Sequence, residues 1–266
     1  MRAITLSGAV LVLGCAGAQA QNSLAERILA VKDGTVRMAY AVQEGICGDG
    51  ETFIRDRRRG DNNYISFDDN GRYRGRNWRE LPCEPGPARV TFVMSGGTVD
   101  RVKLTVGGGQ RSGDSGGIDL GEVSAPAAAK ALLAVAARQR RADHAIFAAT
   151  IADSAVVWPE LLALAKDASV AKETRKSAVF WLSQAAGDAA TQGLAELAEN
   201  EAQDRDIRDQ AVFALSQLPR EEGVPVLIRL ARSNKDPQVR RKAIFWLGQS
   251  DDPRALALFE EILTKR

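Results

Sequence analysis

A motif that recurs four times in the second half of the chain constrains its fold more than any other feature. Successive copies begin 33, 33 and 32 residues apart. A fixed period of this length, with apolar residues at helical spacing inside each unit, is typical of an α-solenoid of stacked two-helix units. Each copy is an alanine, a β-branched residue and a phenylalanine. We expect the alanine and phenylalanine of each copy to form the repeat core: Ala145, Phe147, Ala178, Phe180, Ala211, Phe213, Ala243 and Phe245.

A second apolar pair follows each motif and predicts a second helix in every unit. The pairs are Leu161/Leu164, Leu194/Leu197, Leu227/Leu230 and Phe259/Ile262. Neither helix can bury its apolar stripe alone, so each needs its neighbour and the next unit. We therefore predict a solenoid over residues 123–266, with a degenerate capping helix at 127–140 before four two-helix repeats. We expect a partner to dock along the second helices.

The last unit carries a resemblance to a known family. Its segments Asp236–Ala243, Leu247–Gln249 and Asp252–Ala255 resemble the HEAT-like repeats of the phycobiliprotein-lyase type. The resemblance covers residues 127–266 and implies a helical repeat fold. It does not imply lyase activity, because those enzymes attach chromophores to cytoplasmic proteins and we expect this chain to be exported.

Residues 1–20 have the pattern of a cleavable signal peptide. Arg2 is followed by a short apolar run, and Ala18-Gln19-Ala20 fits a cleavage site before Gln21. The run is shorter than the roughly 20 residues that span a bilayer, and no later segment is long and apolar enough. We expect a bacterial protein that is periplasmic or secreted. An alternative is a lipid anchor at Cys15, because the residues before it loosely resemble a lipobox.

The segment 21–122 predicts a small β-rich domain, so that the whole chain is α+β. Val36, Met38 and Tyr40 alternate with other residues as in a half-buried strand. Two further alternating runs flank Gly96-Gly97, which predicts a β-hairpin. Signal removal leaves two cysteines, Cys47 and Cys83, and an even count in an exported chain predicts a disulfide.

A basic and aromatic segment of the β-rich half is a candidate binding site. Arg72, Arg74, Arg76 and Trp78 combine guanidinium groups with an aromatic ring, a pattern that suits an anionic ligand or polysaccharide. Acidic residues are interleaved with them, so a solvated charged hairpin is the alternative interpretation. The chain as a whole has a formal net charge of only +2, which argues against nucleic acid as a partner.

The chain offers little support for catalysis. Gly113–Gly117 matches the nucleophile motif of chymotrypsin-like serine proteases, with Ser115 as its serine. The only histidine, His144, follows that serine, whereas the family places it before, and a polar linker is the simpler interpretation. Two cysteines and one distant histidine do not supply the ligands of a zinc site, and we expect no metal and no cofactor.

These observations together predict a binding protein. The favoured function is a non-enzymatic extracytoplasmic module or scaffold that presents a solenoid surface to a protein partner. The alternative is a binder of an anionic ligand or polysaccharide through the Arg/aromatic segment. A serine hydrolase that uses Ser115 is the remote alternative.

Overall fold

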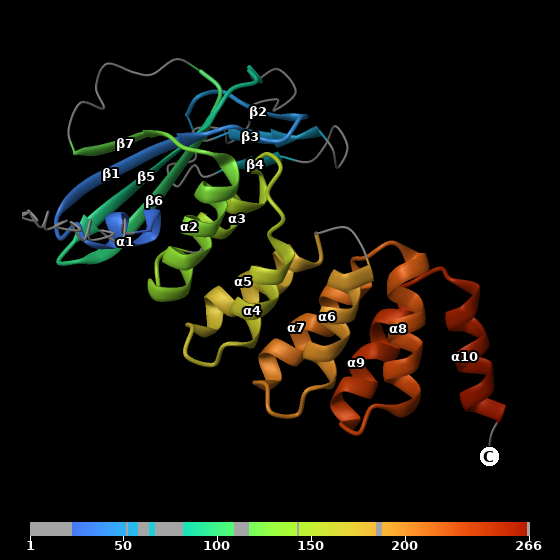
Figure 1. Ribbon diagram of the computed structural model, residues 1–266. Helices are drawn as coiled ribbons and strands as arrows, with labels where there is room; N and C mark the ends of the chain where they lie inside the picture. The colour runs from blue at the N-terminus through green and yellow to red at the C-terminus, as the bar shows by residue number, and fades with distance from the viewer. Residues whose placement is uncertain are drawn as a thin grey trace, which may run out of the picture.

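The computed structural model describes residues 23–51, 53–57, 64–66, 82–108, 117–142, 144–184 and 188–264. A β-containing N-terminal region is followed by a run of helices to the C-terminus (Figure 1). The α+β class and the HEAT-like helical repeat predicted from the sequence are therefore confirmed.

The main sheet has four strands in the order β6-β5-β1-β7. These are β1 (Gly34–Tyr40), β5 (Ala88–Ser95), β6 (Thr98–Val106) and β7 (Ile118–Glu122). β5 pairs antiparallel with both β1 and β6, whereas β7 adds to β1 in parallel. Gly96 and Gly97 connect β5 to β6 with φ of 56° and 77°, a conformation that glycine adopts without strain. The predicted hairpin is confirmed.

A second sheet is smaller and is attached to one end of the main sheet. It contains β2 (Ile46–Gly48), β3 (Phe53–Asp56) and β4 (Tyr64–Ser66) in sequential order. The backbones meet closely at Gly48, where an added Cβ would lie 2.5 Å from the Val106 carbonyl oxygen. The predicted Cys47–Cys83 disulfide is present beside this junction, with its Cα atoms 5.0 Å apart. It ties β2 to the segment that leads into β5.

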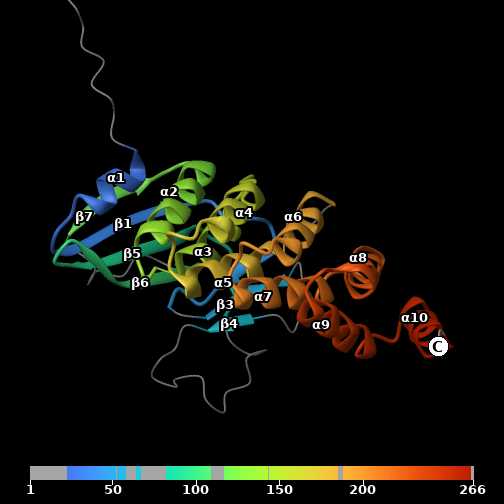
Figure 2. The ribbon, with the colours of Figure 1, turned by 90° about the horizontal axis from the view of Figure 1, so that it is seen from below.

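One face of the main sheet is covered by helices. Alternate residues of β1, β5 and β6 are buried on this face, among them Met38, Phe92 and Leu104. The covering helices are α1 (Leu24–Leu29), α2 (Ala125–Arg138) and α3 (His144–Thr150) (Figures 1 and 2). Because α2 contributes buried alanine, leucine and valine on several sides, it lies between the sheet and the next helices. The expected cap of the solenoid thus also packs against the sheet.

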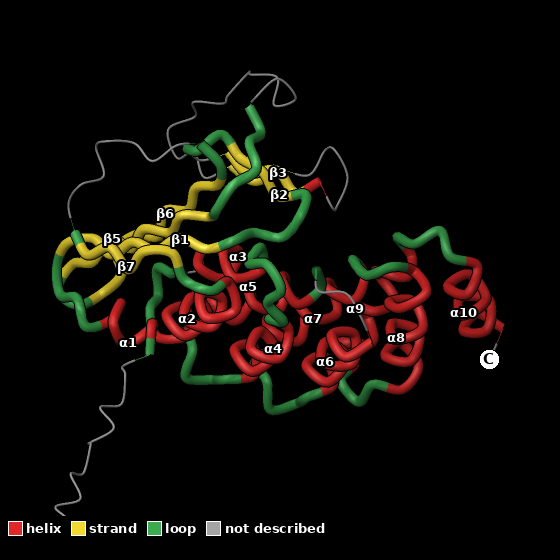
Figure 3. The backbone as a smooth tube through the Cα atoms, turned by 45° about the horizontal axis from the view of Figure 1, so that its top comes forward, coloured by secondary structure: helices red, strands yellow, loops and turns green. Residues whose placement is uncertain are grey.

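Four helix pairs follow in two layers. The first helices are α3, α5 (Lys172–Leu182), α7 (Arg205–Ser216) and α9 (Pro237–Gly248). The second helices are α4 (Trp158–Lys166), α6 (Asp188–Glu199), α8 (Arg220–Ser233) and α10 (Pro253–Thr264). Each first helix packs on the next first helix, and each second helix on the next second helix (Figure 3). The small sheet lies on the side of the first helices in Figures 2 and 3.

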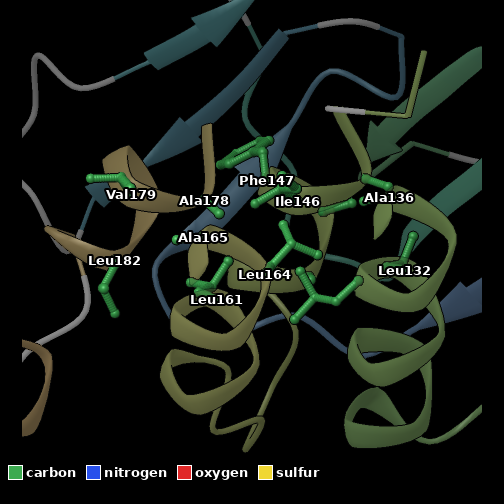
Figure 4. Packing of buried hydrophobic residues seen from close by; sticks show 14 of the residues in the cluster. Leu132, Ala136, Ile146, Phe147, Leu161, Leu164, Ala165, Ala178, Val179 and Leu182 are labelled. Atoms are coloured by element: carbon green, nitrogen blue, oxygen red, sulfur yellow. The ribbon is translucent and has the colours of Figure 1, made fainter. Parts of the chain in front are cut away.

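The layers are joined by small and branched side chains. Leu132, Ile146, Leu161 and Leu164 come together between α2, α3 and α4 (Figure 4). The repeat alanines Ala145, Ala178, Ala211 and Ala243 are all fully buried. One hydrophobic cluster extends from the main sheet into the last helix pair, so the expected boundary near residue 122 lies inside continuous packing.

Candidate functional site

The repeat phenylalanines differ sharply in exposure. Phe147 is 4% exposed, whereas Phe180 is 39% and Phe245 is 55% exposed, and Phe213 is intermediate. The prediction that all four phenylalanines form the repeat core is therefore wrong for Phe180 and Phe245. Both lie on the outer surface of the first helices.

Helix geometry explains this correction. Residues i and i+2 of an α-helix lie about 200° apart, so an alanine and the phenylalanine two positions later face opposite sides. In α5 the buried face is made by Ala178, Val179 and Leu182, and Phe180 points the other way. The spacing i, i+4 connects Ala178 to Leu182 and identifies the true core stripe.

A tryptophan of the following unit covers two of the phenylalanines. The Trp181 ring lies 4.9 Å from the Phe147 ring across α3 and α5. The Trp246 ring lies 5.0 Å from the Phe213 ring across α7 and α9. These contacts remove part of each phenylalanine from water, which is worth about 0.5–1.5 kcal/mol beyond burial for an aromatic pair.

Phe180 and Phe245 lack such a cover. The position in α7 that corresponds to Trp181 and Trp246 is Ala214, which is itself buried. No described helix follows α10 to supply a ring for Phe245. The missing cover of Phe180 is therefore explained by the alanine at position 214.

The aromatic side chains form a row along the first helices. Phe180 and Trp181 lie 5.1 Å apart edge-on, as Phe245 and Trp246 do at 5.0 Å. Phe213 and Phe245 each lie 5.0 Å from Trp246, so these two rings are no more than about 10 Å apart, the spacing of neighbouring packed helices. We call the five side chains Phe180, Trp181, Phe213, Trp246 and Phe245 the aromatic row.

Glutamines accompany the row at equivalent positions. Gln184, Gln217 and Gln249 each stand four residues after a phenylalanine, on the same side of the helix. The Gln217 amide donates to the Ser216 hydroxyl, and that hydroxyl donates to the Phe213 carbonyl. Gln217 and Gln249 are exposed. The amide oxygens and nitrogens can form hydrogen bonds with a backbone that lies beside the rings.

Charged residues near the row are paired between neighbouring helices. Lys172 lies 3.0 Å and Lys176 3.7 Å from the Asp206 carboxylate, and Lys242 lies 3.2 Å from Asp209. The hydrogen bond and charge of Lys172 lower the pKa of Asp206, and the same contact raises the pKa of Lys172. These exposed pairs are worth at most about 1 kcal/mol each. They neutralise the charges that they join, whereas Arg241, four residues before Phe245, adds an exposed positive charge on the same side of α9.

A buried arginine ladder sets the register beneath the row. Arg175 is almost completely buried, and it donates to the Ala165 carbonyl, the Asp204 carboxylate and Gln203. Arg208 donates to Asp236 of the following unit at 2.6 Å. Arg175 thus joins three segments and Arg208 joins two, so that neighbouring first helices are held in register.

The arginine of the last unit has a different role. Arg240 occupies the position of Arg175 and Arg208, but it donates to the Asn234 and Lys235 carbonyls of its own unit. The last unit therefore has the arginine at the equivalent position, but among the described residues this arginine does not pair with a carboxylate of another unit.

Several predicted site residues lie outside the described part of the chain. They are Ala20 and Gln21 of the cleavage site, Cys15, Arg72, Arg74, Arg76, Trp78 and Ser115. His144 is exposed at the start of α3. Within the described ranges no three histidine, cysteine or acidic side chains are grouped to hold a metal ion. None of the helices in those ranges is long and apolar enough to cross a membrane.

The sequence interpretation missed the aromatic row although its signal was present. Trp181 and Trp246 occupy equivalent positions, each directly after a repeat phenylalanine. The combination of an exposed phenylalanine with a glutamine four residues later was not recognised. It could have been found by placing each unit on a helical wheel, because the two residues share a face opposite the buried alanine.

Comparison with protein families supports the fold. Residues 200–266 match the family model of HEAT repeats, and this range contains all of α7 to α10. Comparison with curated proteins finds no relative that matches this chain. The HEAT match supports a HEAT-like repeat protein, a class that typically serves in protein interaction or as a scaffold and is typically non-enzymatic.

Proposed function

We propose that the chain is a non-enzymatic binding module that docks a protein partner on the aromatic row of its first helices. The observation that carries this proposal is the exposure of Phe180 and Phe245 in equivalent positions of a rigid repeat array. Large aromatic side chains are enriched among residues that dominate binding energy. The expected docking along the second helices gives way to docking along the first helices.

The array suits binding because its surface is held in shape before a partner arrives. The arginine ladder and the buried alanines fix the distances between α5, α7 and α9. A surface with little freedom loses little conformational entropy on association. A partner of complementary shape therefore gains affinity from a few aromatic anchors.

We place this function outside the cytoplasm, in the periplasm or in the secreted fraction. The signal-like residues 1–20 support this placement. The Cys47–Cys83 disulfide supports it as well, because such bonds persist in oxidising compartments. Mass spectrometry of the exported protein tests it: a mature chain that begins at Gln21 is expected, and a lipidated Cys15 would replace cleavage at Ala20 by an anchor.

Site-specific crosslinking tests the docking surface. p-Benzoylphenylalanine is introduced at Phe180, at Phe245 or at the control position Val156 of the full exported chain, and native envelope extract is added. Val156 is suitable because it is 71% exposed and lies between α3 and α4, so it is not part of the aromatic row. We expect the same partner to be crosslinked from positions 180 and 245 and not from 156. Equal products at all three positions, or none at 180 and 245, would refute the proposal.

A second candidate function is supported by the outer face of the main sheet. Arg37, Arg89, Arg101 and Lys103 lie on the face opposite the buried residues of β1, β5 and β6. This basic face suits an anionic polysaccharide. The sequence of the segment that contains Arg72, Arg74, Arg76 and Trp78 suits the same class of ligand. The triple variant Arg72→Ala, Arg74→Ala, Arg76→Ala is expected to lose retention on envelope polymers if this candidate is correct.

A further inference from the structure

We infer that Phe180 receives an aromatic side chain, in the first instance a tryptophan, from an extended segment of the partner. This inference rests on the docking function proposed above and specifies the chemistry of its central contact. The array itself shows what fits on a repeat phenylalanine, because an indole occupies that place in two of the other units. The tryptophan of the partner takes the place of the indole that is missing at position 214, where this chain has an alanine.

The neighbouring units define the geometry of the missing contact. Trp181 stacks on Phe147 with a tilt of 30° and Trp246 on Phe213 with a tilt of 51°. α5 packs on α7 as α3 packs on α5 and α7 on α9. An indole over Phe180 therefore has two templates within the same molecule. Ala214 is buried and Phe180 is exposed. The apolar surface that a partner can reach here is therefore the ring of Phe180.

The surroundings of Phe180 favour an uncharged aromatic residue over a charged one. Lys176 on α5 pairs with Asp206 on α7, and each has a further partner, Glu173 for Lys176 and Lys172 for Asp206. Asp209 on α7 pairs with Lys242. A charged side chain at Phe180 would lose hydration without gaining a free counter-charge. Gln217, one unit further, is exposed, and its amide nitrogen donates to the Ser216 hydroxyl, so its amide oxygen is the group that can accept from a partner. An uncharged aromatic side chain of the partner suits the paired charges near Phe180. The partner backbone beside it can form a hydrogen bond with the Gln217 side chain.

Two substitutions separate this contact from other aromatic binding. Ala214→Trp supplies the indole from within the chain and is expected to cover Phe180 as Trp181 covers Phe147. Phe180→Ala removes the receiving ring from a surface position, so the fold is retained. Val156→Ala is the matched control, because it shortens an exposed apolar side chain outside the row.

The test uses the full exported chain and the peptide acetyl-Gly-Ser-(5-fluoro-Trp)-Ser-Gly-amide, observed by fluorine NMR. We expect saturable broadening and a shift of the fluorine signal with the unchanged protein and with Val156→Ala. We expect at least fivefold weaker binding with Phe180→Ala and with Ala214→Trp. The same peptide with leucine in place of tryptophan should compete poorly.

The inference is overturned if the peptide shows no saturable binding to the unchanged protein. It is equally overturned if Phe180→Ala binds as tightly as the unchanged protein, since the peptide then occupies another place. Thermal melting of Ala214→Trp shows whether that variant is folded, and Phe180→Ala decides the question if it is not. Failure here, together with partner crosslinking from positions 180 and 245, would leave the docking function in place and refute only the aromatic anchor.

Discussion

The Tyr40 hydroxyl donates a hydrogen bond to the Ala148 carbonyl oxygen at 2.6 Å, across 108 residues of sequence. It joins the last residue of β1 to the last turn of α3, where carbonyl groups have no partner within the helix. Gln43 extends the same contact, because its side-chain amide donates to the Thr150 and Ala152 carbonyls. Tyr40 and Gln43 therefore supply hydrogen-bond donors to carbonyl groups at and just after the end of α3.

The substitution Tyr40→Phe tests this junction. Tyr40 is fully buried, and burial raises the pKa of its hydroxyl, so the group is a neutral donor at all ordinary pH values. The variant leaves a buried carbonyl without its donor and is expected to lower the free energy of unfolding by about 1–3 kcal/mol. Urea denaturation measures the effect. Thr98→Val removes an exposed hydroxyl that donates to the Ser95 carbonyl, and it should change stability far less.

Thr174→Val is expected to stabilise the protein. Thr174 is buried, and its hydroxyl has no hydrogen-bond partner. The equivalent positions of the next two units hold Ile207 and Val239, both buried. Replacing the hydroxyl by a methyl group removes the cost of burying an unpaired polar atom, about 1–3 kcal/mol.

The matched control for that prediction is Thr150→Val, the same change at a paired hydroxyl. The Thr150 hydroxyl donates to the Phe147 carbonyl at 2.8 Å. Calorimetry should therefore give a higher Tm for the first variant and a lower Tm for the second. A lower Tm for Thr174→Val would show that its hydroxyl has a favourable interaction.

The double variant Cys47→Ala, Cys83→Ala tests the contribution of the disulfide. The bond spans 36 residues and restricts the unfolded chain. Its loss is expected to reduce the free energy of unfolding by about 3–4 kcal/mol. Reductant should destabilise the unchanged protein by a similar amount and leave the double variant unaffected. A reductant effect on the double variant would contradict this account.

Acid titration tests the start of the last helix. Asp252 precedes α10, and its carboxylate accepts hydrogen bonds from the Arg254 guanidinium and backbone N–H. The side-chain hydrogen bond to Arg254 is the main cause that lowers the pKa of Asp252 to about 2. The stabilisation is therefore complete above the ordinary pKa of about 3.8 and is lost as the pH falls from there through about 2.

Asp252→Asn should remove this part of the pH dependence. The difference in Tm between the unchanged protein and the variant should be constant from pH 5 to pH 7 and should shrink below pH 4. Asp251→Asn is the control, because the Asp251 side chain is 96% exposed. An unchanged difference at pH 2 would mean that the carboxylate charge contributes nothing.

The parts of the fold that depend on local sequence could be predicted. Alternation of apolar residues identified β1 and the β5–β6 hairpin, and Gly96-Gly97 marked its turn. The period of about 33 residues identified the repeated helix pairs, and the cysteine count identified the disulfide. Each of these signals arises from neighbours in sequence or from simple counting.

The parts that depend on long-range contacts could not be predicted. Nothing in the pattern around Tyr40 names Ala148 as its partner, and nothing in β7 indicates its parallel pairing with β1. The exposure of Phe180 depends on residue 214, in the next unit, and becomes apparent only when the helices are packed. The sequence pattern therefore identified the phenylalanines of the aromatic row but assigned them to the repeat core, and it did not identify the row as a surface.

A single position in each unit decides whether the phenylalanine of the preceding unit is sealed or available. Tryptophan at that position covers the ring at least in part, as for Phe147 and Phe213, whereas alanine leaves the ring of Phe180 exposed. Exchange of the two residues between units, as in Trp246→Ala with Ala214→Trp, would move the available ring from α5 to α7 while the backbone stays the same. The residue at this position thus determines which first helix of the array presents an exposed phenylalanine to a partner.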